Sequence, residues 1–188
     1  MSRAVSLALV AQLALVATAF AQDRNGADTP SDWAASHYKE FGIWKSVCDE
    51  RDEDGTLAQR CYIRYADVFS QAPRFAAVFM FVFQKDRKTA IQYAFEQGTV
   101  YENDGLRIDR DGQTVWTASE ECRQGPNCLM TEPQTVSSTL EAFSGGGELV
   151  QNFTDRHGSP RKLRWDLTGF EQALADYREQ STQRNLLD

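Results

Sequence analysis

Hydrophobic and polar residues in the first half of the chain alternate at the two-residue spacing of β-strands. The longest apolar segment after residue 21 is residues 75–83 (FAAVFMFVF). Its odd-numbered positions are mostly phenylalanine and its even-numbered positions are small or aliphatic, so both faces of an extended segment would be apolar. We therefore expect a strand that is covered on both sides. Arg74 and Lys85 flank it with charge, which limits aggregation of an exposed apolar strand.

Shorter segments with the same character surround this run and are separated by turn signals. The predicted strands are residues 42–48, 60–65, 90–95, 106–110, 113–117, 148–154 and 161–167. Asp111-Gly112 between two of them is a strong hairpin signal. The charged segment 49–55 ends in Asp54-Gly55 and predicts a second hairpin with a charged tip.

Two helices are expected in the second half. Residues 136–143 could form a short helix that stops at the glycines 145–147. The C-terminal helix has Thr168 as its predicted N-cap and Glu171 three residues later, which is the pattern of a capping box. Its apolar face carries residues at helical spacing, namely Phe170, Ala173, Leu174 and Tyr177.

Many short strands with turn punctuation predict an all-β fold of the sandwich type, with one helix at the C-terminus. Helices do not alternate with strands, so a parallel α/β fold is not expected. Trp44 lies four residues before Cys48 on a predicted strand, and the two therefore share a face. We expect Trp44, Phe170 and Leu174 to be buried and to serve folding, because the helix must bury its apolar face to be stable.

The N-terminus has the pattern of an export signal. Arg3 supplies the positive charge, residues 4–16 are mostly Ala, Leu and Val, and Ala19-Phe20-Ala21 forms a small-x-small cleavage site. We expect cleavage between Ala21 and Gln22 and release to the periplasm or outer surface. A membrane anchor is the alternative, but the apolar stretch is shorter than the roughly 20 residues that a bilayer span needs.

The remaining chain divides into three parts. A polar leader is expected over residues 22–40, a single domain over residues 41–180 and a tail over residues 181–188. The whole chain carries a formal charge of −7, and residues 1–21 contain Arg3 as their one charged residue, so the mature charge is −8. An acidic protein without a basic cluster is a poor candidate for binding nucleic acid or anionic lipid. No later segment is apolar and long enough to span a membrane.

Four cysteines follow the export signal and indicate a disulfide framework. They allow three pairings. We expect Cys48–Cys61 and Cys122–Cys128, because each pair is close in sequence and encloses turn residues. A zinc site made of the same thiolates is the alternative, although its usual C-x2–4-C spacing is absent. No C-x-x-C motif is present, so a redox-active pair is not expected.

No residue pattern assigns a catalytic, metal or cofactor site. His37 and His157 are the two histidines, and Ser144 lacks the first half of a G-x-S-x-G motif. An EF-hand alignment on Gly55 puts Cys61 where the bidentate glutamate should be, so calcium binding is not expected. We expect a protein that is not an enzyme and has no cofactor. The alternatives left open are a periplasmic hydrolase that uses scattered Asp, Glu or Ser residues, and an envelope folding or stress factor.

Aromatic residues gather near the predicted start of the domain. They are Trp33, Tyr38, Phe41 and Trp44. Such a cluster is typical of core and edge packing, and it is also typical of a recognition surface, because aromatic residues are enriched at interfaces.

The order of several landmarks resembles the invasion-associated locus B family of Gram-negative bacteria. The resemblance rests on residues 41–44 (FGIW), Cys48, Cys61 with Tyr62, the later pair Cys122 and Cys128, and residues 167–170 (LTGF). It implies an exported, immunoglobulin-like β-sandwich at the cell envelope, linked in pathogenic members to entry into host cells. It implies structural roles for Trp44, Tyr62, Phe170 and the cysteines, and no catalytic residue. The implied partner is an envelope or host-surface protein or glycan.

Overall fold

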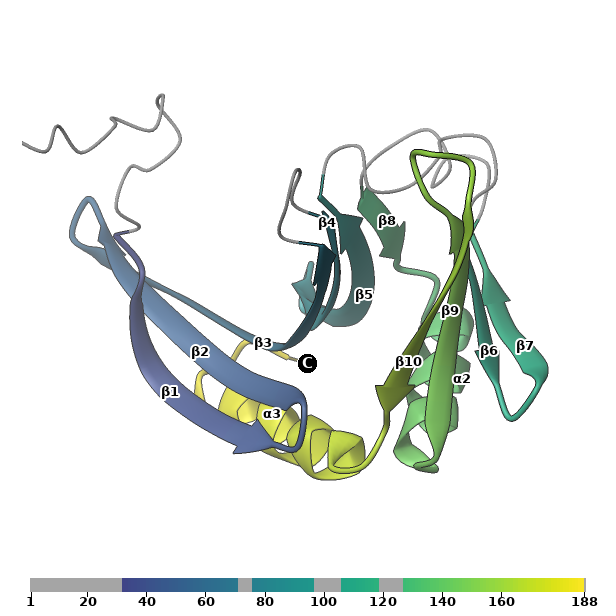
Figure 1. Cartoon of the computed structure of the whole chain (residues 1–188). Helices are drawn as coiled ribbons and strands as arrows, with labels where there is room; N and C mark the ends of the chain where they lie inside the picture. The colour runs from purple at the N-terminus through teal and green to yellow at the C-terminus, as the bar shows by residue number, and fades with distance from the viewer. Residues whose placement is uncertain (1–31, 71–75, 97–105, 119–126, 188) are drawn as a thin grey trace, which may run out of the picture. The chain divides into compact units, whose positions relative to one another are not determined.

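The computed structural model describes residues 32–70, 76–96, 106–118 and 127–187 (Figure 1). The predicted export signal, the first part of the predicted leader and Cys122 lie outside the described residues. None of the helices in the described ranges is long and apolar enough to cross a membrane.

The first sheet has six antiparallel strands, and five of them follow one another along the chain. Its order is β1 (Ala34–Phe41), β2 (Trp44–Glu53), β3 (Thr56–Ser70), β4 (Ala76–Lys85), β5 (Lys88–Phe95) and β8 (Asn127–Met130). The hairpin between β2 and β3 turns at Asp54-Gly55, as predicted, but its strands are longer than expected because residues 49–53 continue β2. A charged turn at Asp86 and Arg87, both with positive φ, joins β4 to β5.

The second sheet has four antiparallel strands. Its order is β10 (Pro160–Asp166), β9 (Glu148–Thr154), β6 (Leu106–Arg110) and β7 (Gln113–Thr117). The predicted bounds of β6, β7 and β9 are confirmed. Asp111 and Gly112 both have positive φ, which is the turn geometry that an Asp-Gly hairpin needs.

Two helices complete the described part. Helix α2 (Pro133–Ser144) begins at a proline, and the Glu132 carboxylate accepts hydrogen bonds from the backbone N–H groups of Gln134 and Thr135. Helix α3 (Phe170–Gln183) contacts β1, β2 and β3 as well as α2. Figure 1 shows α3 running along the long strands of the six-stranded sheet.

Aromatic rings join the two sheets and α3 in one core. Trp44 is fully buried, and its ring centroid lies 4.9 Å from that of Phe170 in α3 and 6.1 Å from that of Trp165 in the second sheet. Tyr93 of β5 stacks on Trp116 of β7 with centroids 5.5 Å apart. The prediction that Trp44, Phe170 and Leu174 are buried is confirmed.

The connection before α3 differs from the predicted capping box. The N-cap is Gly169, with φ of 86°, and Thr168 precedes it. A Cβ on Gly169 would lie 2.6 Å from the carbonyl oxygen of Phe41, and a Cβ on Gly42 would lie 2.9 Å from the carbonyl oxygen of Thr168. The turn between β1 and β2 therefore meets the segment before α3 backbone to backbone, and this contact requires glycine on both sides.

The two ends of the domain are also corrected. Residues 34–40 were expected in the leader, but they form β1, which is hydrogen-bonded to β2. Residues 181–188 were expected to form a free tail, but α3 continues to Gln183 and Ser181 is buried. Arg87 donates hydrogen bonds to the backbone carbonyls of Asn185 and Leu187, so these residues are tied to the first sheet.

Two further expectations fail on the first sheet. On β4, Val78, Met80 and Val82 are buried, but Phe79, Phe81 and Phe83 are only half-buried, so the strand is not fully covered on both sides. The mostly antiparallel, sandwich-like architecture is confirmed, but the immunoglobulin-like strand order is not. An immunoglobulin domain distributes its early strands between two sheets, whereas here β1 to β5 form one continuous meander.

Candidate functional site

The outer face of the six-stranded sheet carries aromatic and arginine side chains from adjacent strands. Strand pairing places Tyr62 of β3 opposite Phe83 of β4, and Arg64 opposite Phe81. Phe81 in turn lies opposite Gln92 of β5. We call the set of Arg60, Tyr62, Arg64, Phe81, Phe83 and Gln92 the aromatic–arginine face. These side chains line a surface hollow of about 320 Å3.

The phenyl rings are held on this face by the strand period. Successive side chains of β4 point to opposite faces, so the buried Val82 leaves Phe81 and Phe83 on the other side. The ring centroids of Tyr62 and Phe81 are 6.4 Å apart in an edge-on arrangement. Phe81 also stacks with Phe79 at 6.4 Å. The result is a row of half-buried rings across two strands.

One buried carboxylate holds Arg60 and Tyr62 of the aromatic–arginine face in place. Asp49 of β2 is 7% exposed and accepts hydrogen bonds from the Tyr62 hydroxyl at 2.9 Å and from Arg60 Nη2 at 3.0 Å. Burial, together with the bond to Asp49, raises the pKa of Tyr62, so the phenol stays protonated as a donor. The Arg60 guanidinium also lies 4.0 Å from the ring centroid of Trp33.

Arg64 differs from Arg60 in having no counter-ion among the described residues. Its side chain is exposed, and within the described ranges it forms no ion pair. It stands beside the rings of Phe81 and Tyr62 in the hollow. An exposed guanidinium next to half-buried rings can accept a carboxylate while apolar groups cover the rings.

The predicted aromatic cluster near the start of the domain separates into two environments. Trp44 is in the core, where its indole N–H donates to the backbone carbonyl of Asp166 at 3.2 Å, and Phe41 packs against the same core. Tyr38 is 50% exposed on the outer side of β1, and Trp33 packs against Arg60 and Arg51. Tyr62, expected to be structural, lies on the outer face.

The predicted disulfide between Cys48 and Cys61 is present. The two cysteines lie directly opposite each other on β2 and β3 and are both buried on the inner face. This bond removes two of the thiolates that the alternative zinc site would need. Cys128 is also disulfide-bonded. Its pairing with Cys122 stays a prediction, because Cys122 lies outside the described residues.

His37 holds helix α3 against the edge of the sheet. Its Nε2 lies 2.7 Å from Oδ2 of Asp176, a carboxylate only 8% exposed, and Lys39 approaches the other oxygen at 3.5 Å. Burial raises the pKa of Asp176, but interactions with His37, Ser46 and Lys39 outweigh it, so the pKa is lowered. Ser46 nearby is 1% exposed, and no hydrogen bond within the described ranges joins it to His37.

His157 lies in the turn between β9 and β10 and is exposed. The neighbouring Asp155 organises this turn by accepting hydrogen bonds from the backbone N–H groups of His157 and Ser159 and from Arg161 Nε at 2.6 Å. The two histidines thus lie at separate places, one against α3 and one in a surface turn. The structure does not bring them together with a serine in the described residues.

Acidic side chains near the tip of the β2–β3 hairpin contact other residues of the same hairpin. Asp52 Oδ1 accepts a hydrogen bond from the backbone N–H of Gly55 at 2.8 Å, and Glu53 pairs with Arg51. Across the described ranges, no three histidine, cysteine, aspartate or glutamate side chains are grouped as metal ligands would be.

The comparison with solved structures finds a similar fold. The sequence matches no family model and no curated protein. The crystal structure of invasion associated protein b from Bartonella henselae matches with a TM-score of 0.50 and 16% sequence identity, and the match covers 79% of this chain and 99% of that one. The likeness concerns the fold alone.

Proposed function

We propose that this chain is an exported, non-enzymatic protein of the cell envelope that binds a protein partner through the aromatic–arginine face. The export signal in residues 1–21 and the fold likeness to an invasion-associated protein support the envelope location. The landmark residues 41–44 and 167–170 support membership of the invasion-associated locus B family.

The observation that carries the proposal is the composition of the aromatic–arginine face. Tyrosine, tryptophan, phenylalanine and arginine are the residues enriched at the centres of protein interfaces. Here Tyr62, Phe81 and Phe83 are half-buried side by side, with Arg64 exposed among them. Rings of this kind still have apolar area to bury, and a partner that covers them gains roughly 25 cal/mol for each Å2 removed from water.

The partner is expected to present a carboxylate beside apolar side chains. Arg60 is already neutralised by Asp49, so Arg64 is the cation of this face that is free to recognise an acid. An acidic side chain reaching Arg64 would bring its neighbours over Phe81, because the two residues are directly opposite on adjacent strands. An envelope or host-surface protein with such a patch fits this geometry.

Affinity capture from cell envelopes, followed by binding measurements with the purified partner, tests the proposal. Phe81→Ala and Arg64→Ala should each weaken binding of the same partner about tenfold or more. Leu57→Ala and Lys88→Ala serve as matched controls, because both side chains are exposed and neither lines the hollow. These two variants should bind as the wild type does.

Four results would contradict the proposal. Equal loss of binding in the control variants would show that the partner does not bind at the aromatic–arginine face. Capture of a glycan in place of a protein would show that the proposed class of partner is wrong. Turnover by the purified wild-type protein in a panel of hydrolase substrates, with no partner captured, would favour the enzyme alternative. Suppression of aggregation of unfolded proteins without a defined partner would favour a folding factor.

A further inference from the structure

The four-stranded sheet carries a polar row on its outer face, away from the aromatic–arginine face. Strand pairing places Arg107 of β6 opposite Asn152 of β9, and Asn152 opposite Lys162 of β10. Thr117 of β7 lies opposite Arg107 and extends the row to the fourth strand. Four neighbouring strands thus contribute a hydroxyl, a guanidinium, an amide and an ammonium group in one line.

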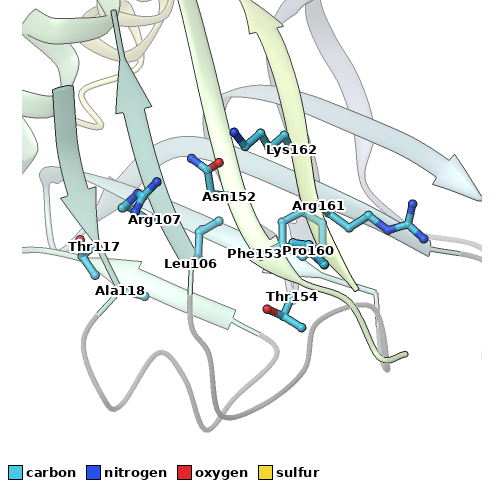
Figure 2. Close-up of a pocket in the computed structure, with 10 residues that line it drawn as sticks. All are labelled: Leu106, Arg107, Thr117, Ala118, Asn152, Phe153, Thr154, Pro160, Arg161 and Lys162. Carbon is cyan, nitrogen blue, oxygen red and sulfur yellow. The ribbon is translucent and has the colours of Figure 1, made fainter. Parts of the chain in front are cut away.

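A surface hollow of about 320 Å3 opens beside this row (Figure 2). Leu106, Phe153 and Ala118 are among the lining residues, but their side chains are buried toward the core, so Pro160 is the exposed apolar residue of this lining. Figure 2 shows the side chains of Asn152 and Lys162 near each other, whereas Arg161 extends away from them. The hollow therefore combines an exposed proline with hydrogen-bonding groups from neighbouring strands.

The charges that line this hollow are all positive. They belong to Arg107, Arg161 and Lys162, and none of the lining residues is acidic. Asp109 fixes the Arg107 guanidinium at 2.9 Å, and Asp155 fixes Arg161 at 2.6 Å. Lys162 is exposed and has no ion pair in the described part of the chain. Lys162 is therefore the uncompensated positive charge of this hollow, in a protein of net charge −7.

Asp109 also positions the amide of the row. Its Oδ2 accepts a hydrogen bond from Asn152 Nδ2 at 2.8 Å and one from Arg107 Nε at 3.1 Å. The Thr114 hydroxyl donates to the other oxygen at 2.9 Å. One carboxylate thus holds Arg107 and Asn152 in fixed orientations, so a ligand would meet preorganised donors, which lowers the entropy cost of binding.

We propose that this hollow binds an acidic sugar unit, one that carries a carboxylate or a phosphate group. The acid would pair with Lys162 and Arg107, the hydroxyl groups would reach Asn152 and Thr117, and the C–H face of the ring would rest on Pro160. The volume lies at the small end of ligand sites, which suits one monosaccharide unit better than a large ligand. The site is on the other sheet from the aromatic–arginine face and does not depend on the function proposed for that face.

Titrations of the labelled full-length mature protein, followed by amide NMR shifts, test this proposal. The probes are glucuronate, glucose 6-phosphate, neutral glucose and inorganic phosphate. We expect saturable shifts in β6, β9 and β10 with at least one acidic sugar, at least tenfold tighter than with glucose or with phosphate alone. Which acidic sugar binds distinguishes the carboxylate from the phosphate form. Added salt should weaken the binding.

Lys162 variants give the decisive comparison. Lys162→Ala should weaken binding of the acidic sugar about tenfold, the effect of one charge-assisted contact, and Lys162→Glu should abolish it. Lys85→Ala removes the same charge from the other sheet and should leave binding unchanged. Unaltered amide spectra without ligand would show that the variants remain folded, as expected for an exposed side chain.

Each remaining outcome overturns the proposal. Inorganic phosphate that binds as tightly as glucose 6-phosphate would reduce the hollow to a simple anion site. Binding that survives Lys162→Glu, or shifts confined to the six-stranded sheet, would remove the site from this hollow. Absence of saturable binding by both acidic sugars would reject the ligand class, whatever the capture experiment shows for the aromatic–arginine face.

Discussion

The two faces of the six-stranded sheet are both rich in aromatic residues, but they differ in how far those residues are buried. On the inner face Trp44 is fully buried, with the rings of Phe170 and Tyr65 at 4.9 and 5.7 Å. On the outer face Tyr62 and Phe81 also contact each other, at 6.4 Å, but both remain half-buried. The difference is what packs against them: α3 and the four-stranded sheet close the inner face, and no described element closes the outer one.

Aromatic density alone therefore does not separate a core from a recognition surface. Both faces have strand-compatible spacing, and both mix rings with polar residues in the sequence. The inner rings fill space between elements and stabilise the fold by burial. The outer rings are held in place by their own strands and keep area that a partner can cover. Mutations on the two faces should therefore affect different properties.

The largest expected effect distinguishes the two faces directly. Trp44→Ala or Phe170→Ala should lower the free energy of unfolding by about 3–5 kcal/mol, because each removes a fully buried ring. Phe81→Ala should lower it by about 1 kcal/mol, since its ring is only half-buried. Urea unfolding of the oxidised protein measures both. Equal losses would mean that the outer face is as closed as the core.

A smaller effect tests how α3 is seated on the inner face. Gly169→Ala should cost more than about 2 kcal/mol, because alanine disfavours positive φ and its Cβ would lie 2.6 Å from the carbonyl oxygen of Phe41. Gly55→Ala is the matched control, with a similar φ of 82° and no atom within 4 Å. It should cost about 1 kcal/mol, the conformational part alone. Similar values for the two variants would show that the close backbone approach relaxes easily.

The smallest expected effect concerns acid. The pKa of Asp176 is lowered in the folded protein, so its contribution to stability is present above its unfolded pKa and is lost as pH falls through the folded value. Wild type should therefore lose about 1–2 kcal/mol more than Asp176→Asn between pH 6 and pH 2. Thermal unfolding at a series of pH values measures this difference. Parallel pH profiles would show that the bond from His37 does not help to hold α3.

Local turn chemistry made much of the fold predictable. Asp54-Gly55 and Asp111-Gly112 marked two hairpins, because few other residues adopt positive φ there without cost. Alternation then located β6, β7 and β9 to the residue. Strand β1 escaped prediction because its side chains are mostly exposed and show no alternation, and its order comes from pairing with β2.

Other features depended on contacts between distant residues. The capping box at Thr168 has the right sequence pattern, but the close approach of Gly169 to Phe41 moves the helix start by one residue. The aromatic–arginine face requires Arg64 and Phe81 to be neighbours, and only the register between β3 and β4 makes them so. The row of Arg107, Asn152 and Lys162 likewise exists only once three strands have paired.

The backbone contact between Gly42 and Gly169 also bears on the order in which the chain can fold. The turn after β1 lies early in the sequence, whereas the segment that packs against it, just before α3, lies more than 120 residues later in chain order. A chain that emerges N-terminus first must therefore keep the indole of Trp44 uncovered until Asp166 and Phe170 arrive. Contacts this distant in sequence close slowly. Helix α3 is the last described element along the chain, so the core is completed only after its residues have been synthesised.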